Sequence, residues 1–173
     1  MSFNMFNWLR KKNNLSSPEY KFRHSRKEAS EEYVKHGEDL ANGNRPEEAL
    51  EYFDKAIQIL PNNDFAWGDK GLILDKLGRA DEALESFSHA IAIDSTNPIT
   101  WHNKGLTLIK LKRLVEAMEC FDRAIENNEK YAKAWYNKGR ALAMLNKADE
   151  GQKCFDTARK LDPFLYSKLK KMS

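Results

Sequence analysis

Histidine and cysteine are the residues of this 173-residue sequence with the greatest capacity for nucleophilic or metal chemistry. The chain contains four histidines and two cysteines: His24, His36, His89, His102, Cys120 and Cys154. Their spacing matches no zinc-ligand pattern, and no nucleophile motif or glycine-rich phosphate loop accompanies them. We therefore expect no catalytic residue, no metal site and no cofactor, and we interpret the chain as a protein that is not an enzyme.

Adjacent acidic residues could in principle perform acid–base chemistry, and Asp81 with Glu82 is such a pair. The pair directly precedes an apolar pattern of helical period. Negative charge in the first turn of a helix interacts favourably with the helix dipole. We therefore assign these carboxylates a structural role.

The overall composition is that of an ordinary globular protein, with 41% hydrophobic and 32% charged residues. A net charge of +3 is too small to predict a nucleic acid partner. No apolar run approaches the roughly 18 residues that a membrane-spanning helix needs. The N-terminus also lacks the order of charged and apolar segments that marks a secretory peptide.

The first part of the chain is basic. Residues 1–29 contain seven basic and two acidic side chains, so that their net charge is +5 and that of the remaining chain is −2. Within residues 1–12, three aromatic side chains and a leucine precede three basic ones: Phe3, Phe6, Trp8, Leu9, Arg10, Lys11 and Lys12. We expect residues 1–17 to form a disordered tail. Two other interpretations stay open, namely that residues 1–12 contact an anionic membrane surface or fold back into a groove of the same chain.

A helical lead-in is expected over residues 18–29. Pro18 suits the first turn of a helix, where its missing N–H would have no partner. Ser25 and Glu28 offer a second start in the form of a capping box. The sequence does not decide between these two starts.

One pattern recurs at an interval of 34 residues over most of the chain. Its members are Tyr33, Trp67, Trp101 and Trp135; Gly37, Gly71, Gly105 and Gly139; Phe53, Phe87, Phe121 and Phe155; and Ala56, Ala90, Ala124 and Ala158. Four copies in register predict a stack of identical supersecondary units. We refer to residues 30–63, 64–97, 98–131 and 132–165 as repeats one to four.

Each repeat is expected to be a helix, a turn and a second helix. In repeat two, the apolar residues Ala83, Leu84, Phe87, Ala90 and Ile91 follow the helical period. The equivalent turn positions hold Asn44, Gly78, Lys112 and Asn146, mostly types that tolerate the left-handed conformation. Glycine inside the first helix costs about 1 kcal/mol relative to alanine, so we expect a neighbouring helix to approach closely there.

An aromatic residue and glycine in the first helix, paired with alanine, phenylalanine and alanine in the second, resembles the tetratricopeptide repeat family. The resemblance covers residues 30–165. It implies an all-α, right-handed solenoid of four helix–turn–helix repeats, followed by a short capping helix at residues 166–173. It also implies a scaffold or adaptor that binds a protein or peptide in a groove lined by the first helices.

By position in the repeat, the resemblance assigns the following residues of repeats two to four to this groove: Phe65, Asp69, Leu72, Ile99, His102, Asn103, Leu106, Lys133, Tyr136, Asn137 and Arg140. The four apolar members could form an exposed strip, which would mark an interaction site. Lys133 and Arg140, with neighbouring amides, could hold a carboxylate or a polar backbone. Alternatively, Phe65 and Ile99 pack between neighbouring repeats.

Some members of this family clamp the C-terminal carboxylate of a chaperone with a defined set of lysine, asparagine and arginine residues. In repeats two to four, the matching positions hold Gly68, Leu72, Asn103, Lys133 and Asn137, of which two of five agree with the clamp. We therefore expect no clamp of this kind.

Cys120 and Cys154 are also 34 residues apart. Equivalent atoms in stacked helices lie roughly 8–10 Å apart, whereas a disulfide needs Cα atoms within about 7 Å. We expect both thiols to be reduced, as in a cytoplasmic protein.

The sequence therefore predicts a cytoplasmic, non-catalytic scaffold that assembles protein complexes. The alternative is a peripheral membrane adaptor anchored by residues 1–12. The identity of the partner, the peptide sequence bound and the oligomeric state do not follow from the sequence.

Overall fold

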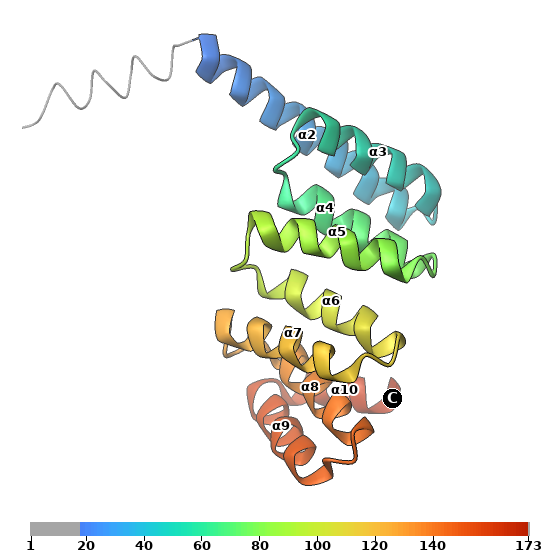
Figure 1. Ribbon diagram of the computed structural model, residues 1–173, viewed down its shortest axis with the longest axis vertical. Helices are drawn as coiled ribbons and strands as arrows, with labels where there is room; N and C mark the ends of the chain where they lie inside the picture. The colour runs from blue at the N-terminus through green and yellow to red at the C-terminus, as the bar shows by residue number, and fades with distance from the viewer. Residues whose placement is uncertain (1–17, 173) are drawn as a thin grey trace, which may run out of the picture. The chain divides into compact units, whose positions relative to one another are not determined.

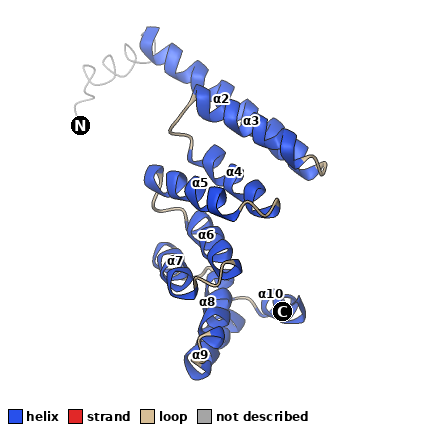
Figure 2. Ribbon diagram, turned by 45° about the vertical axis from the view of Figure 1, so that its right-hand side comes forward, coloured by secondary structure: helices blue, strands red, loops and turns tan. Residues whose placement is uncertain are grey.

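The computed structural model describes residues 18–172, which form nine helices and no strand (Figure 2). The helices are α2 (Pro18–Asn42), α3 (Pro46–Ile59), α4 (Asp64–Lys76), α5 (Ala80–Ile93), α6 (Pro98–Lys110), α7 (Leu114–Asn127), α8 (Ala132–Met144), α9 (Ala148–Leu161) and α10 (Pro163–Met172). The prediction of an all-α protein is confirmed.

Each repeat corresponds to one pair of antiparallel helices. The pairs are α2 with α3, α4 with α5, α6 with α7, and α8 with α9. Helix α2 is 25 residues long and already begins at Pro18, so the lead-in and the first helix of repeat one are continuous. Its N-terminal end runs past the end of α3 (Figure 1).

The chain divides into two compact parts between Asn63 and Asp64. In the second part, three helix pairs follow one another along its length (Figure 1). Helix α10 packs against α8 and α9. The Tyr166 ring makes edge contacts with Tyr136 and Phe155, at centroid distances of 5.8 and 6.5 Å. Helix α10 thus covers an aromatic surface of repeat four.

A contact between glycine and phenylalanine holds the two helices of every pair together. A Cβ atom added to Gly37, Gly71, Gly105 or Gly139 would lie 2.6, 2.7, 2.7 or 2.8 Å from a ring carbon of Phe53, Phe87, Phe121 or Phe155, respectively. Real Cβ atoms do not approach this closely, so the phenylalanine ring occupies the space of the missing side chain. The close approach predicted at the helical glycines is confirmed.

Replacing one of these glycines should destabilise the fold. We expect Gly71→Ala to lower the free energy of unfolding by about 2 kcal/mol, because the new methyl group overlaps the fully buried ring of Phe87. Denaturant unfolding measures this change. Gly68→Ala is the matched control, because this glycine lies on the same helix and has room for a methyl group. Outside that helix, the nearest heavy atom to the added Cβ would be the Thr100 hydroxyl oxygen at 4.0 Å. That substitution should raise stability by up to about 1 kcal/mol through helix propensity, and equal losses in both variants would contradict our account.

The turn inside each repeat has the same backbone conformation. Asn44, Gly78, Lys112 and Asn146 have φ angles of 59°, 78°, 59° and 60°. In repeat three, Lys112 N–H donates to the Ile109 carbonyl and Arg113 N–H to the Leu108 carbonyl, both at 2.9 Å. These two hydrogen bonds satisfy carbonyls at the end of α6 in a Schellman motif. The left-handed conformation predicted from Asn and Gly therefore extends to a lysine.

Lys112 pays a steric cost in this conformation that glycine would not. We expect Lys112→Gly to raise the free energy of unfolding by about 0.5–1 kcal/mol. The reverse substitution at the equivalent position, Gly78→Lys, should lower it by a similar amount. Thermal or denaturant unfolding of the two variants tests the pair, and a loss of stability in Lys112→Gly would refute the steric argument.

Candidate functional site

The predicted groove residues lie on α4, α6 and α8, the first helices of repeats two to four. Three of them are exposed: Phe65, Ile99 and Lys133. Five are half-buried: Asp69, Leu72, Asn103, Leu106 and Arg140. Three are buried: His102, Tyr136 and Asn137. The residues carried over from the family by position thus fall into an accessible set and a buried set.

The accessible set contains four apolar residues, which we call the apolar strip: Phe65, Leu72, Ile99 and Leu106. Phe65 and Ile99 occupy equivalent positions near the starts of α4 and α6, and they are 66% and 54% exposed. Leu106 packs partly against the buried cluster that contains Leu108 and Phe121. The strip therefore combines two side chains open to solvent with two that are half-buried. The exposure of Phe65 and Ile99 disfavours the alternative that they pack between repeats.

A polar crosslink joins α4 to α6 beside this strip. The Asp75 carboxylate accepts hydrogen bonds from the Thr107 hydroxyl at 3.0 Å and from the Lys110 ammonium at 2.6 Å. The Thr107 side chain is fully buried, and Asp75 keeps only 16% of its side chain exposed. Partial burial strengthens a charge-assisted bond of this kind. The crosslink fixes α4 relative to α6 and so holds the two halves of the strip in one arrangement.

Basic side chains lie on α8. Lys133 is exposed, and half-buried Arg140 donates a hydrogen bond of 3.1 Å to the Asn137 side-chain oxygen. Arg140 keeps further N–H groups for other acceptors, because a guanidinium has five. These two cations can therefore interact with a carboxylate on a bound molecule.

The buried set forms a polar cluster between repeats three and four. The Asn137 side-chain amide donates to His102 Nε2 at 3.0 Å and to the Lys133 carbonyl at 3.0 Å. The His102 ring also makes an edge contact with Tyr131, with ring centroids 5.2 Å apart. At 5% and 6% exposed, His102 and Asn137 join α6 to α8 and present almost no surface to a ligand. Tyr136, at 4% exposed, packs against the phenylalanine and tyrosine rings of α9 and α10 described above.

Burial determines the ionisation of His102. Desolvation lowers its pKa to about 4, while a hydrogen bond to Asn103 acts in the opposite direction and the charge of Lys133 lowers the pKa further. The ring is therefore neutral near pH 7. Because Nε2 accepts from Asn137, the proton of the neutral ring is on Nδ1. This nitrogen faces the Asn103 side-chain oxygen Oδ1 at 3.4 Å and the Tyr131 hydroxyl at 3.5 Å.

This neutral histidine predicts a loss of stability in acid. Below pH 6.5 the unfolded chain binds a proton at this histidine, whereas the folded chain does not until about pH 4. Stability from this group is therefore complete above pH 6.5 and falls as the pH drops towards 4, by about 3 kcal/mol. His102→Leu removes this dependence. We expect the difference in free energy of unfolding between wild type and His102→Leu to shrink by that amount between pH 7 and pH 4, and a constant difference would contradict the buried neutral state.

The histidine, cysteine and carboxylate side chains of residues 18–172 do not gather into a metal site. No cluster of three or more His, Cys, Asp or Glu side chains in this range could hold a metal ion. Cys120 and Cys154 are both free and buried, and burial raises the pKa of the Cys120 thiol to about 11.

None of the helices α2 to α10 is both long enough and apolar enough to cross a membrane. The predicted tail and the proposed membrane contact of residues 1–12 lie outside the residues that the structure describes.

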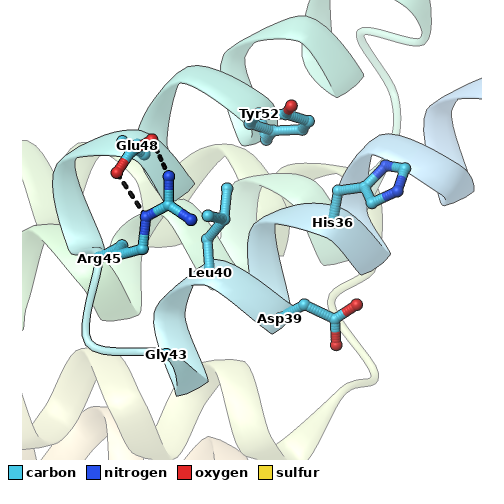
Figure 3. A pocket seen from close by; sticks show the side chains of 7 residues that line it. All are labelled: His36, Asp39, Leu40, Gly43, Arg45, Glu48 and Tyr52. Carbon is cyan, nitrogen blue, oxygen red and sulfur yellow. Dashed lines mark hydrogen bonds and ion pairs between the residues drawn. The ribbon is translucent and has the colours of Figure 1, made fainter.

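Two adjacent hollows lie on the first helix pair, where the sequence suggested no site. The larger, of about 350 Å³, is lined by side chains of α2 and α3 that include His36, Asp39, Leu40 and Tyr52 (Figure 3). The smaller, of about 290 Å³, shares His36 and Tyr52 and adds Glu32 and Tyr33. A sequence signal did exist, because Glu32 and Asp39 stand where later repeats have small or apolar residues.

Comparison with known families matches three stretches of the chain. Residues 98–131 match one model described as Tetratricopeptide repeat, and residues 52–85 and 120–153 match another with the same description. Together these stretches cover slightly more than half of the chain. The match at 52–85 begins in the second helix of repeat one, so the two models are out of phase with each other.

Several solved structures have a similar fold. MamA residues 41 to the end from Desulfovibrio magneticus RS-1 is 21% identical, with a TM-score of 0.71 over 91% of this chain and 92% of that one. PilF from Pseudomonas aeruginosa is 23% identical, with a TM-score of 0.76 over 80% and 64%. The first tetratricopeptide domain of Spaghetti (RPAP3), solved with the HSP90 peptide SRMEEVD, is 26% identical, with a TM-score of 0.58 over 61% and 85%.

Among curated proteins, MJ0572 of Methanocaldococcus jannaschii, which is uncharacterized, is 46% identical over 50 residues. The matched stretch spans 29% of this chain and 58% of that protein.

Proposed function

Because the chain belongs to the tetratricopeptide repeat family, we propose that it is a non-catalytic scaffold or adaptor that binds a protein or peptide on α4, α6 and α8. The observation that carries this proposal is the exposure of Phe65 and Ile99, at 66% and 54%, on equivalent positions of adjacent first helices. The free energy of burying a large apolar side chain is about 1.5–3 kcal/mol. Covering both side chains therefore supplies much of the affinity of a modest peptide complex.

The chemistry of this surface suggests a class of ligand. Apolar side chains of the ligand would pack on the apolar strip, and an acidic side chain or a terminal carboxylate would interact with Lys133 and Arg140. The crosslink from Asp75 to Thr107 and Lys110 supports the proposal, because a surface held rigid before binding loses less entropy when a ligand docks. A peptide that carries both apolar and acidic residues fits these features.

The RPAP3 domain was solved with a chaperone peptide, but this chain differs at the residues that such clamps use. Gly68 and Leu72 stand where the clamp requires lysine and asparagine. Leucine offers an apolar contact in place of polar recognition of a carboxylate. We therefore propose a partner that is selected mainly through its apolar side chains. We also place the protein in a reducing compartment such as the cytoplasm, in accord with its two free, buried thiols.

Charge reversal on the exposed residues of the strip tests the proposal. We expect Phe65→Glu/Ile99→Glu to reduce recovery of partners in affinity capture from the native cell by about tenfold or more. The reason is that the complex loses two apolar side chains that the partner would bury, at a cost of several kcal/mol of binding free energy. Both side chains point to solvent, so the free energy of unfolding should change by about 0.5 kcal/mol or less at each site.

Val115→Glu is the matched control for this experiment. Val115 is 58% exposed on α7, a second helix, so it undergoes the same chemical change outside the proposed surface. Partner recovery should be retained in this variant. Undiminished recovery by a folded Phe65→Glu/Ile99→Glu protein would remove the proposed binding surface.

A further inference from the structure

One face of the first helix pair is uncovered in residues 18–172. In repeats three and four, the position equivalent to Glu32 holds Thr100 and Ala134, and the position equivalent to Asp39 holds Thr107 and Ala141. All four of these residues are at most 7% exposed. Ala134 packs with Ala124 and Ile125, and Ala141 packs with Cys120 and Phe121, all residues of the preceding second helix, α7. Glu32 and Asp39 are exposed instead, so no described helix takes the place that α7 has in repeat four.

This open face carries the two hollows, and aromatic rings form their walls. The Tyr52 ring lies 5.9 Å from that of Tyr33 and 5.7 Å from that of His36, measured between centroids. Figure 3 shows Leu40 between the rings of Tyr52 and His36 on one side and the pair formed by Arg45 and Glu48 on the other. Together the hollows offer an aromatic and aliphatic surface large enough for one or two bulky side chains.

The face carries the carboxylates of Glu32 and Asp39, and the Lys55 ammonium lies 4.6 Å from the centroid of the Tyr52 ring. The Arg45 guanidinium is already engaged by Glu48 through two hydrogen bonds of 2.6 and 2.5 Å. Glu32 and Asp39, in contrast, form no ion pair with any residue in the described range 18–172. Two free carboxylates beside an aromatic hollow favour a ligand that combines cationic and aromatic side chains.

We propose that the occupant of this face is the N-terminal segment of the same chain, residues 1–12. The segment has aromatic side chains at Phe3, Phe6 and Trp8, followed by the basic run from Arg10 to Lys12, and it contains no acidic residue. Its aromatic rings fill the hollows beside Tyr52, and its cations neutralise Glu32 and Asp39. The surface belongs to repeat one and is separate from the peptide site proposed on repeats two to four.

The length of the intervening chain permits this contact. His36 lies 18 residues beyond Pro18 on helix α2, which corresponds to about 27 Å of helix. Trp8 precedes Pro18 by ten residues, and ten residues of extended chain reach about 33 Å. A chain that reverses direction before α2 can therefore bring Trp8 to the hollows.

The solvent exposure of Trp8 in the full-length protein tests the proposal. The protein is labelled with 5-fluorotryptophan, and the Trp8 resonance among the four tryptophans is assigned by its loss in Trp8→Phe. Its relaxation by a water-soluble gadolinium chelate is compared with that of a synthetic peptide of residues 1–12. We expect roughly threefold slower paramagnetic relaxation in the protein, because a ring seated in a hollow loses most of its contact with solvent.

Charge-neutral variants show whether the protection comes from this face. Glu32→Gln/Asp39→Asn should return Trp8 to the relaxation of the free peptide, as should high salt, which screens exposed charges. Glu47→Gln/Glu51→Gln is the matched control, because both side chains are exposed on α3 and line neither hollow. This control should leave Trp8 protected.

Several outcomes would overturn the proposal. Relaxation equal to that of the peptide would show that residues 1–12 do not dock, and equal protection in Glu32→Gln/Asp39→Asn would place them elsewhere. Protection that rises with protein concentration would make a second copy the occupant. Protection that appears only with phosphatidylserine vesicles would identify an anionic membrane as the binding surface.

Discussion

The structure depends on one contact, in which a glycine of the first helix accommodates a phenylalanine ring of the second. The ring lies so close that even a methyl group on the glycine would overlap it. This contact sets the separation of the two helices in every pair and is repeated at 34-residue intervals. Because each pair is built in the same way, its other surfaces are free to vary. The apolar strip and the acidic hollows are such variations on a common support.

The fold could be predicted from the sequence because packing within a pair is local and periodic. The glycines, the phenylalanines and the turn residues each recur in register, so the same packing requirement can be read four times along the sequence. Lys112 shows the strength of this argument, since it adopts the left-handed conformation despite its side chain. The hydrogen bonds that end α6 require that conformation whatever residue occupies the position.

The candidate site could be predicted only in part, because burial depends on neighbours that do not recur. Position in the repeat placed His102 and Asn137 on the predicted groove, but their mutual hydrogen bond and the Tyr131 ring enclose them. Tyr136 is covered by α10, a helix outside the repeat pattern. The hollows on the first helix pair were not predicted, because they occur where the chain departs from the repeat pattern instead of following it. Glu32 and Asp39 differ from their repeat equivalents, and that difference was visible in the sequence.

The same two carboxylates bear on how copies of the chain meet one another. A stack of similar repeats has two ends that are complementary in shape, and a head-to-tail contact that does not close on itself grows into a filament. A helix that docks on the open face of repeat one would strip water from Glu32 and Asp39, which costs free energy unless that helix supplies cations. On repeat four, α10 already occupies the aromatic surface. The desolvation of two carboxylates on repeat one and the cover that α10 provides on repeat four both act against open-ended polymerisation.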